Sequence, residues 1–321
     1  MPPRPARRDG PPSGEGRAGP TPAPTPAPTG PDEPSGPDLL CTFGDAAMDV
    51  VVELSRLPVA DDDVPGGITL SAGGQAANVA AWYVALGGRA RLVTRLGDDR
   101  AGSLVSTMLA DAGVEVVGAR GGRTGIVASM VTPDGKRSMV SDRGAGADLA
   151  GLEVEDAWFE RSAWLHLSGY ALFGEHSSSV AITAGERARR AGAVVSVDLS
   201  SAVLVAAVGR AAVRRAVEAC GATLVFANAA EHAAAGPLAV DQAVVKLGAA
   251  GYVLIDGEGE HRSDALRAAT VRDTTGAGDA FAAGWLLGGP ALALEAARTC
   301  VATVGAMPPA PVGAGATGTA R

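Results

Sequence analysis

A loop of small residues at 273–279 (DTTGAGD) has two features that chemistry on a phosphate group requires. Its glycines let the backbone turn tightly, so that consecutive N–H groups can hold an anion. The helical run that follows directs the positive end of its dipole to the same place. Asp279 closes the loop, where a carboxylate can accept the proton of a hydroxyl that attacks a phosphoryl group. Alternatively, the loop only caps a helix, and Asp279 offsets the helix dipole.

The elements that must position this loop follow the pattern of an α/β fold. Strand-like and helix-like runs alternate from residue 164 onward, which indicates parallel strands with helices on both faces of a sheet. The strand-like runs are 164–170, 193–200, 222–228, 243–248 and 251–257, and the helix-like runs are 178–192, 209–220 and the residues after Asp279. One more strand-like run, 265–271 (ALRAATV), leads into the loop, so we expect the loop to join a strand to a helix.

The first half of the globular sequence adds strands of a second kind. Buried strand patterns at 39–45 and 89–97, with helical patterns at 75–86 and 101–113, fit the same α/β core. The extended runs 48–54 and 68–74, and two alternating runs within 124–142, instead predict strand pairs. Because these pairs do not fit a parallel core, we expect them to form a small β-lid over one edge of it.

The composition favours some classes of binding partner and one cell compartment over others. A net charge of -8 argues against nucleic-acid binding, because phosphate backbones select basic surfaces. No apolar run reaches the roughly 18 residues of a membrane helix, and the arginines near the N-terminus precede no apolar signal segment, so we expect no membrane partner. Cys41, Cys220 and Cys300 are far apart and odd in number, which predicts buried free thiols and a reducing cytoplasm.

Four motifs in order resemble those of the ribokinase-like (PfkB) family of carbohydrate kinases. Residues 273–281 (DTTGAGDAF) look like the family's second signature, and residues 73–80 (GGQAANVA) resemble its first. Residues 228–231 (NAAE) resemble its Asn-x-x-Glu motif, and residues 246–251 (KLGAAG) are similar to its nucleotide loop at a strand end. The resemblance covers roughly residues 39 to 312. It implies a three-layer α/β/α sandwich with a mostly parallel sheet and a β-lid, and ATP-dependent phosphorylation of a hydroxyl on a small sugar or sugar acid.

On the phosphate side, the resemblance assigns the roles of general base and anion hole to the glycine loop. Asp279 would be the base, and Gly276, Ala277 and Gly278 would cradle the transferring phosphate. The nucleotide-binding residues implied are Asn228, Glu231, Lys246, Gly248, Gly251 and Thr275. Lys246 stands where the family often has a hydroxyl residue, and it would either contact phosphate or face solvent.

Metal binding is implied at two places. Asn228 and Glu231 would organise Mg²⁺ through water, which suits a cation that takes few oxygen ligands and keeps its waters. The same two residues could instead form a capping box at a helix start. Asp273 and Thr275 match one half of the site at which some family members bind a monovalent cation such as K⁺. The other half, near Gly305, departs from the usual pattern.

On the acceptor side, the candidate hydroxyl-binding residues lie on four segments. The resemblance implies Asp49, Gly73, Gly74, Asn78 and Arg143. Asp198 ends a core strand that faces the same crevice, which makes it a second-rank candidate. A carboxylate can accept two hydrogen bonds from neighbouring hydroxyls, and an amide offers both a donor and an acceptor. Gln75 stands where ribokinases tend to have Lys, and Ala47 where they tend to have Asn, so ribose is not specifically indicated.

The resemblance and the composition together predict the organisation of the chain. We expect a disordered tail at 1–37, a kinase domain at 38–312 and a flexible C-terminal tail at 313–321. The lid would come from about 49–72 and 124–143, and its exposed strand edges favour a homodimer.

Two other functions fit parts of the sequence. A nucleoside kinase on the same fold would need an aromatic wall for the base, and the substrate-side segments offer only Phe43 and Phe173. A sugar-binding sensor without catalysis would not need Asp279 and an intact glycine loop.

Overall fold

The main sheet explains how segments far apart in the sequence reach one edge of the molecule. The computed structural model describes residues 39–134 and 137–309; the predicted tails, 1–37 and 313–321, lie outside them. Among these residues, a nine-stranded sheet has the order β13-β12-β11-β10-β9-β8-β1-β4-β5. The strands are β1 (Leu39–Phe43), β4 (Arg89–Leu96), β5 (Val114–Arg120), β8 (Ser162–Ser168), β9 (Val194–Asp198), β10 (Leu224–Asn228), β11 (Gln242–Lys246), β12 (Tyr252–Asp256) and β13 (Gly259–Ser263). Every pairing from β5 to β11 is parallel, whereas β12 and β13 pair antiparallel at the edge.

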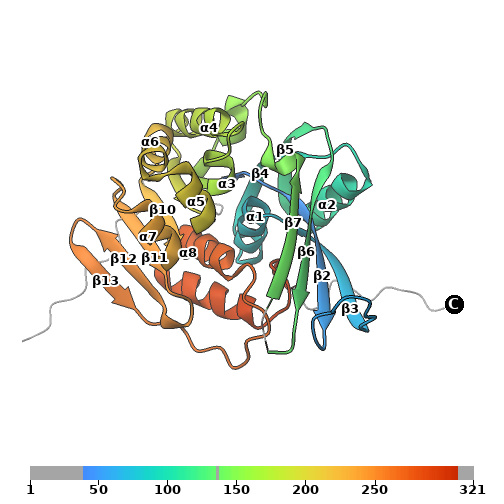
Figure 1. Ribbon diagram of the computed structural model, residues 1–321. Helices are drawn as coiled ribbons and strands as arrows, with labels where there is room; N and C mark the ends of the chain where they lie inside the picture. The colour runs from blue at the N-terminus through green and yellow to red at the C-terminus, as the bar shows by residue number, and fades with distance from the viewer. Residues whose placement is uncertain (1–38, 135–136, 310–321) are drawn as a thin grey trace, which may run out of the picture. The chain divides into compact units, whose positions relative to one another are not determined.

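Helices cover both faces of this sheet, which confirms the predicted three-layer α/β/α architecture (Figure 1). The helices are α1 (Gln75–Ala85), α2 (Arg100–Asp111), α3 (Gly169–Leu172), α4 (Ser178–Arg190), α5 (Ala202–Val208), α6 (Arg210–Cys220), α7 (Ala229–Ala235) and α8 (Ala277–Val301), with short turns η1 (Ala145–Ala147), η2 (Asp156–Phe159) and η3 (Gly248–Ala250). Helices α1, α2 and α8 pack on one face, and α4 to α7 pack on the other. Side chains alternate between the two cores, as Leu40 and Cys41 do in β1. Cys41, Cys220 and Cys300 are buried free thiols, as predicted.

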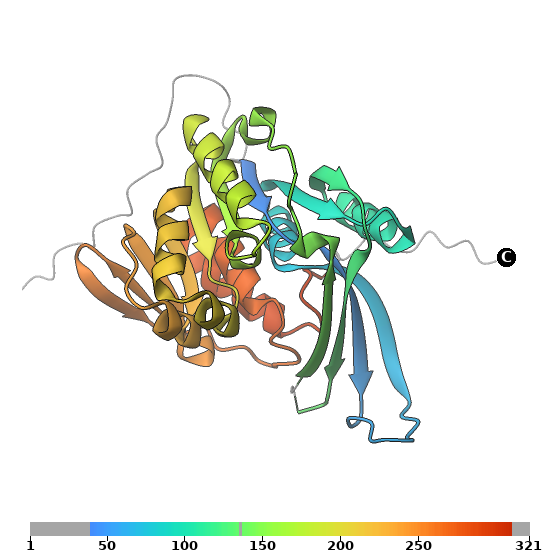
Figure 2. The same ribbon diagram turned by 45° about the horizontal axis from the view of Figure 1, so that its top comes forward.

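A second, four-stranded sheet, here called the lid sheet, projects from the α/β core (Figure 2). Its strands are β2 (Ala47–Leu54), β3 (Gly66–Gly73), β6 (Thr124–Val131) and β7 (Arg137–Gly144), in the order β3-β2-β6-β7. The two strand pairs are antiparallel and are joined by a parallel pairing of β2 with β6.

The register of the lid sheet separates its two faces. Residues in register share a face, and side chains alternate along each strand. One face carries Asp49 and Glu53 from β2 together with Arg137 and Arg143 from β7. The opposite face carries exposed apolar side chains, those of Ile68, Leu70, Ile126 and Val140. One face of the lid sheet therefore carries most of its charged side chains, and the other carries most of its exposed apolar side chains together with Asp142.

The segment before the glycine loop corrects one prediction. Residues 265–271 form no strand, although their alternating pattern predicts one. The preceding strand β13 already occupies the edge position of the sheet beside β12, and residues 265–271 pair with no strand there. Leu266 and Val271 are instead partly exposed and line a cleft beside the loop.

Helix α8 is longer and more apolar than the sequence interpretation allowed. By length and mean hydropathy it is the one helix of the described residues that could cross a membrane. It is interrupted at Gly288 and Gly289, just before Pro290, where the backbone leaves the helical conformation. Its side chains, among them Ala280, Phe281 and Leu286, are part of the core shared with α1. These features are those of a core helix in an α/β fold.

Candidate functional site

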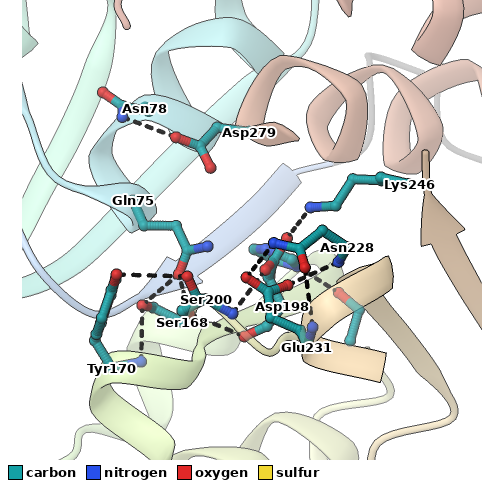
Figure 3. Close-up of polar contacts among 12 residues, drawn as sticks. Gln75, Asn78, Ser168, Tyr170, Asp198, Ser200, Asn228, Glu231, Lys246 and Asp279 are labelled. Carbon is teal, nitrogen blue, oxygen red and sulfur yellow. Dashed lines mark hydrogen bonds and ion pairs between the residues drawn. The ribbon is translucent and has the colours of Figure 1, made fainter. Parts of the chain in front are cut away.

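Three neighbouring strands end in polar side chains at the same edge of the main sheet. Asp198, Asn228 and Lys246 are the last residues of β9, β10 and β11. Because these strands are parallel and adjacent, their carboxyl ends place the three side chains together (Figure 3). Asp279, in the first turn of α8, lies opposite them. Residues from four segments thus surround one space beside the glycine loop.

Asp279 meets Asn78 where the starts of α8 and α1 come together. The Asn78 side-chain amide donates a hydrogen bond of 2.8 Å to Oδ2 of Asp279. The amide oxygen of Asn78 is buried and has no partner among the described residues, which leaves an acceptor open for a ligand. Burial raises the pKa of Asp279 to about 7; the hydrogen bond from Asn78 opposes this shift, and the negative charge of Asp198 adds to it. Asp279 is therefore suited to exchange a proton near neutral pH.

The backbone of the glycine loop is held by its own hydrogen bonds and by the segment after α8. Asp273 accepts hydrogen bonds from the N–H and the hydroxyl of Thr275 and from the N–H of Gly305. Gly276 has a φ of 77°, and a Cβ there would lie 2.7 Å from the backbone of Ala306. Only glycine fits this left-handed, closely packed position without strain. Asp273 and Thr275 therefore have structural partners without any cation.

Lys246 is the buried cation of the phosphate side. Its ammonium donates a hydrogen bond of 2.5 Å to Oδ2 of Asp198, and a Cβ at Gly278 would lie 3.1 Å from the same nitrogen. Burial disfavours the charged form, but the carboxylates of Asp198 and Glu231 outweigh it and raise the pKa of Lys246. The prediction that Lys246 could face solvent is wrong, because the ion pair holds it against the glycine loop.

Asn228 and Glu231 form the capping box that the sequence left as an alternative. Asn228 Oδ1 accepts from the N–H of Glu231, and the carboxylate of Glu231 accepts from both the N–H and the amide of Asn228. Glu231 is buried, and burial with the nearby charge of Asp198 raises its pKa. The described residues contain no cluster of three or more His, Cys, Asp or Glu side chains able to enclose a metal. The pair fits a sparse site in which a divalent cation keeps most of its waters.

A cleft of about 760 Å³ opens on the outer side of the glycine loop. Lys246, Gly248 and Gly251 line it together with Gly278, as do apolar side chains from 265–271 and α8. Its volume is within the range of sites for small organic ligands. The nucleotide-binding candidates of the 246–251 segment therefore lie on this cleft.

On the opposite side of Asp279, acceptor-side candidates gather around two carboxylates. The Asp49 carboxylate lies so close to Gly73 that a Cβ at Gly73 would overlap it, and Gly74 precedes α1 as its N-cap residue. Burial, and then the negative charge of Asp45, raise the pKa of Asp49 to about 7. No hydrogen bond or ion pair joins the Asp49 side chain to a protein group among the described residues. Asp49 is thus a buried carboxylate that a ligand hydroxyl could satisfy.

Asp198, another predicted sugar ligand, is already engaged by protein groups. Its Oδ2 accepts from Lys246, and its Oδ1 accepts from the N–H of Ser200. Its position at the end of β9 agrees with the predicted crevice, but its hydrogen bonds connect it to the phosphate side. Compared with Asp198, Asp49 therefore has more of its hydrogen-bonding capacity left for a ligand.

A network of polar side chains on the acceptor side went unrecognised in the sequence. Ser168 Oγ lies 2.7 Å from Oε1 of Gln75 and 3.2 Å from Oδ1 of Asp45, and Ser200 donates to the same Gln75 oxygen. With its oxygen occupied by two serines, Gln75 keeps its NH₂ group for other partners (Figure 3). Ser168 is the last residue of β8 and Ser200 lies two residues after the end of β9, and this position at strand ends was the signal that could have identified them.

Arg143 reaches the acceptor side from the lid sheet. Its guanidinium carbon lies 3.4 Å from the centre of the Tyr170 ring, a cation–π contact, and Nη1 is 3.6 Å from Oδ2 of Asp45. Tyr170 is the aromatic residue beside this site, whereas Phe43 and Phe173 are buried in the hydrophobic core. The expectation that Phe43 and Phe173 are the available aromatic residues is therefore wrong.

Comparisons of the sequence and of the fold with known proteins find similar kinases. The model of the pfkB family carbohydrate kinase matches residues 37–306. ATP-dependent ribose-1-phosphate kinase of Halopiger xanaduensis is 31% identical over 275 residues, which are 80% of this chain and 88% of that protein. The crystal structure of adenosine kinase from Sinorhizobium meliloti has 26% identity and a TM-score of 0.74, and the match covers 85% of this chain and 96% of that one.

Other relatives match a shorter segment. Fructokinase-1 of Oryza sativa is 32% identical over 166 residues, so the chain spans about half the length of that curated relative, and the match is half of this chain as well. The names of these relatives refer to different substrates, and the sequence identity of about 30% to each of them is too similar to favour one substrate.

Proposed function

The chain belongs to the pfkB family of carbohydrate kinases, and we propose that it transfers the terminal phosphoryl group of ATP to a hydroxyl of a small sugar or sugar acid. One observation carries the proposal: Asp279 and the glycine loop stand between a nucleotide-sized cleft and a group of unsatisfied hydroxyl-binding side chains. A base between a phosphate donor and a hydroxyl is the arrangement that phosphoryl transfer requires.

In the proposed reaction, the acceptor hydroxyl gives its proton to Asp279 while its oxygen forms a bond to the terminal phosphorus. The bond from that phosphorus to the bridging oxygen breaks, and ADP leaves. The N–H groups of Gly276, Ala277 and Gly278, with the start of α8, stabilise the charge on the transferring oxygens. Lys246 adds a positive charge at the same loop.

Metal ions belong to the same proposal. Mg²⁺, when bound, would neutralise phosphate charge, and Asn228 and Glu231 would hold it through water. The surplus of buried carboxylates over cations, with Asp198, Glu231 and Asp279 around a single Lys246, favours such a cation. Asp273 and Thr275 remain the candidates for a monovalent cation such as K⁺.

The acceptor side favours neutral sugars over sugar acids. Asp45, Asp49 and the amide oxygen of Asn78 accept hydrogen bonds, so a compound rich in hydroxyl donors suits them. A carboxylate or phosphate on the substrate would meet these negative charges. Among the described residues, the lid-sheet cation at the acceptor cluster is Arg143, and it already contacts Tyr170 and Asp45.

A nucleoside is the second candidate acceptor, and Tyr170 is the observation that favours it. The phenol ring could stack with a base if Arg143 moved away from its face. The similarity to an adenosine kinase is compatible with this alternative.

A screen for ADP release tests the proposal and separates these acceptors. The full chain with MgATP should turn over neutral pentoses or hexoses at least tenfold faster, in kcat/KM, than sugar acids, phosphorylated sugars or nucleosides. Turnover of nucleosides alone would support the alternative. Binding of sugars without any turnover would contradict the kinase proposal and favour a sensor.

The apolar outer face of the lid sheet supports a homodimer as part of the proposal. Ile68 and Val140 are 69% and 65% exposed on this face, which suits burial against a second copy. Light scattering of the full chain should give twice the 31.8 kDa mass of one chain, and the single-chain mass at micromolar concentration would contradict it. We place this enzyme in the cytoplasm, where ATP is available and three buried free thiols stay reduced.

A further inference from the structure

Arg137 brings a positive charge from the lid sheet to the glycine loop. It is the first residue of β7, and its Nη1 donates a hydrogen bond of 2.8 Å to the hydroxyl of Thr274. Thr274 belongs to the loop that leads to Asp279, and it lines the nucleotide-sized cleft. A guanidinium from a separate sheet therefore stands at the edge of the phosphate side.

The register of β7 shows why this side chain points toward the site. Arg137 pairs with Val131 of β6, and Val131 pairs with Glu53 of β2, which places Arg137 on the polar face of the lid sheet. Arg143 lies six residues farther along and so faces the same way, roughly 20 Å away at the rise of an extended strand. One strand thus presents an arginine to each side of Asp279: Arg137 at the phosphate loop and Arg143 at the acceptor cluster.

Arg137 hydrogen-bonds to a neutral hydroxyl, which binds a guanidinium less strongly than an anion does. No ion pair joins Arg137 to a carboxylate within residues 39–134 and 137–309, and its guanidinium hydrogen-bonds to the Thr274 hydroxyl instead. A guanidinium has five N–H donors and binds phosphate oxygens with charge-assisted hydrogen bonds, which are stronger than a bond to a neutral hydroxyl. A phosphate oxygen at this loop would therefore compete well with Thr274.

The excess of negative charge around the loop also favours a further cation at this place. Among the described residues, Asp198, Glu231 and Asp279 surround one buried cation, Lys246, and ATP would add several negative charges. Charge on the transferring phosphoryl group must be stabilised in the transition state, and an arginine is suited to this task.

We propose that Arg137 is a catalytic residue that leaves Thr274 and donates hydrogen bonds to the terminal phosphate of ATP. The inference rests on the proposed phosphotransferase function and adds the lid sheet to the phosphate side of that site. Bond formation and breaking are those of the transfer itself: the acceptor oxygen replaces the bridging oxygen on phosphorus, its proton goes to Asp279, and Arg137 contributes charge only.

The competing explanation is that Arg137 only fastens the lid sheet to the loop. A second contact offers a matched control for this role: Arg272, one residue before the glycine loop, pairs with Glu53 of β2 at 3.1 Å. Both residues of that pair are exposed and lie outside the lining of the cleft. Glu53→Gln removes a contact between the lid sheet and the loop without removing a cation from the phosphate side.

Calorimetric binding of ADP and of a non-hydrolysable ATP analogue, both with Mg²⁺, tests the proposal without knowledge of the acceptor. Arg137→Met should weaken binding of the analogue at least tenfold and leave ADP affinity within about twofold, because only the analogue carries the terminal phosphate. Arg137→Lys should recover part of the loss, and Glu53→Gln should leave the affinity ratio unchanged. Circular dichroism checks that each variant is folded.

Kinetics with the best acceptor of the screen give an independent readout. Arg137→Met should lower kcat roughly 100-fold or more, while the KM of the acceptor changes less than threefold. Equal weakening of ADP and the analogue, no change in either, or the same pattern in Glu53→Gln would overturn the catalytic role and leave Arg137 as a fastener of the lid. A wild-type chain that binds neither nucleotide would overturn the proposed function itself, and this inference with it.

Discussion

Replacing Asp279 with Asn is expected to lower the rate of phosphoryl transfer roughly a thousandfold while ADP affinity stays within about twofold. Asn has nearly the same shape and can still accept the hydrogen bond from Asn78, but it cannot take a proton from the acceptor hydroxyl. Steady-state kinetics and ADP binding measured on the same preparation check both parts. Asp111→Asn, an exposed carboxylate at the end of α2, is the matched control and should keep full activity.

The raised pKa of Asp279 predicts a second effect of the same substitution, on the pH dependence of stability. Because its pKa is about 7 when folded and 3.8 in its ordinary state, the folded chain binds the proton more tightly. The free energy of unfolding therefore falls as pH rises from about 4 to about 7, and the loss persists above 7. Asp279→Asn should match wild type at pH 4 and exceed its stability at pH 8 by on the order of 1–3 kcal/mol. Urea unfolding measures this difference.

Activity should depend on the same ionisation of Asp279, but it should increase with pH, whereas the free energy of unfolding decreases. The base acts only when deprotonated, so kcat/KM of the wild type should decrease about tenfold per pH unit below about 7. Asp279→Asn should lose this limb of the profile. A variant with activity within tenfold of wild type, or one less stable than wild type at pH 8, would contradict the role of Asp279 as a buried base.

Replacing Lys246 with Met is expected to destabilise the chain by about 3–5 kcal/mol, because it leaves Asp198 buried without its cation. Glu231 and Asp279 would lose the same compensating charge. ADP and ATP should also bind more weakly, since Lys246 lies on the cleft and against Gly278. Urea unfolding and calorimetric binding measure the two effects separately.

A double variant separates the ion pair from the phosphate contact. Adding Asp198→Asn to Lys246→Met should restore most of the stability, because the uncompensated carboxylate is gone, but it should not restore nucleotide affinity. Arg187→Met, which removes an exposed ion pair with Asp156, should cost no more than about 1 kcal/mol. If Lys246→Met were as mild as this control, the pair would not be the buried link described above.

Sequence reasoning predicted the fold, because the alternation of strands and helices is a local pattern that indicates three layers. The resemblance assigned the two glycine turns to the acceptor and phosphate sides of one site, but the contact of Asn78 with Asp279 was not predicted. The strand predicted at 265–271 failed because alternation alone does not show whether a neighbouring strand is available to pair.

Contacts set by the order of strands were beyond the sequence. Lys246 and Asp198 are 48 residues apart, and only the adjacency of β9, β10 and β11 joins their side chains. Arg137 reaches Thr274, 137 residues away, through the register of the lid sheet. Tyr170 has no motif around it, and its place beside Arg143 follows from the position of the short helix α3.

The most direct test of the account follows the phosphate itself. ATP labelled in its terminal phosphate is incubated with the wild-type chain, with Asp279→Asn and with the best neutral sugar of the screen, and the products are separated. The account predicts labelled sugar phosphate and an equal amount of ADP with the wild type, and almost no labelled sugar with Asp279→Asn. Label found only in inorganic phosphate, or equal sugar labelling by both proteins, would contradict it.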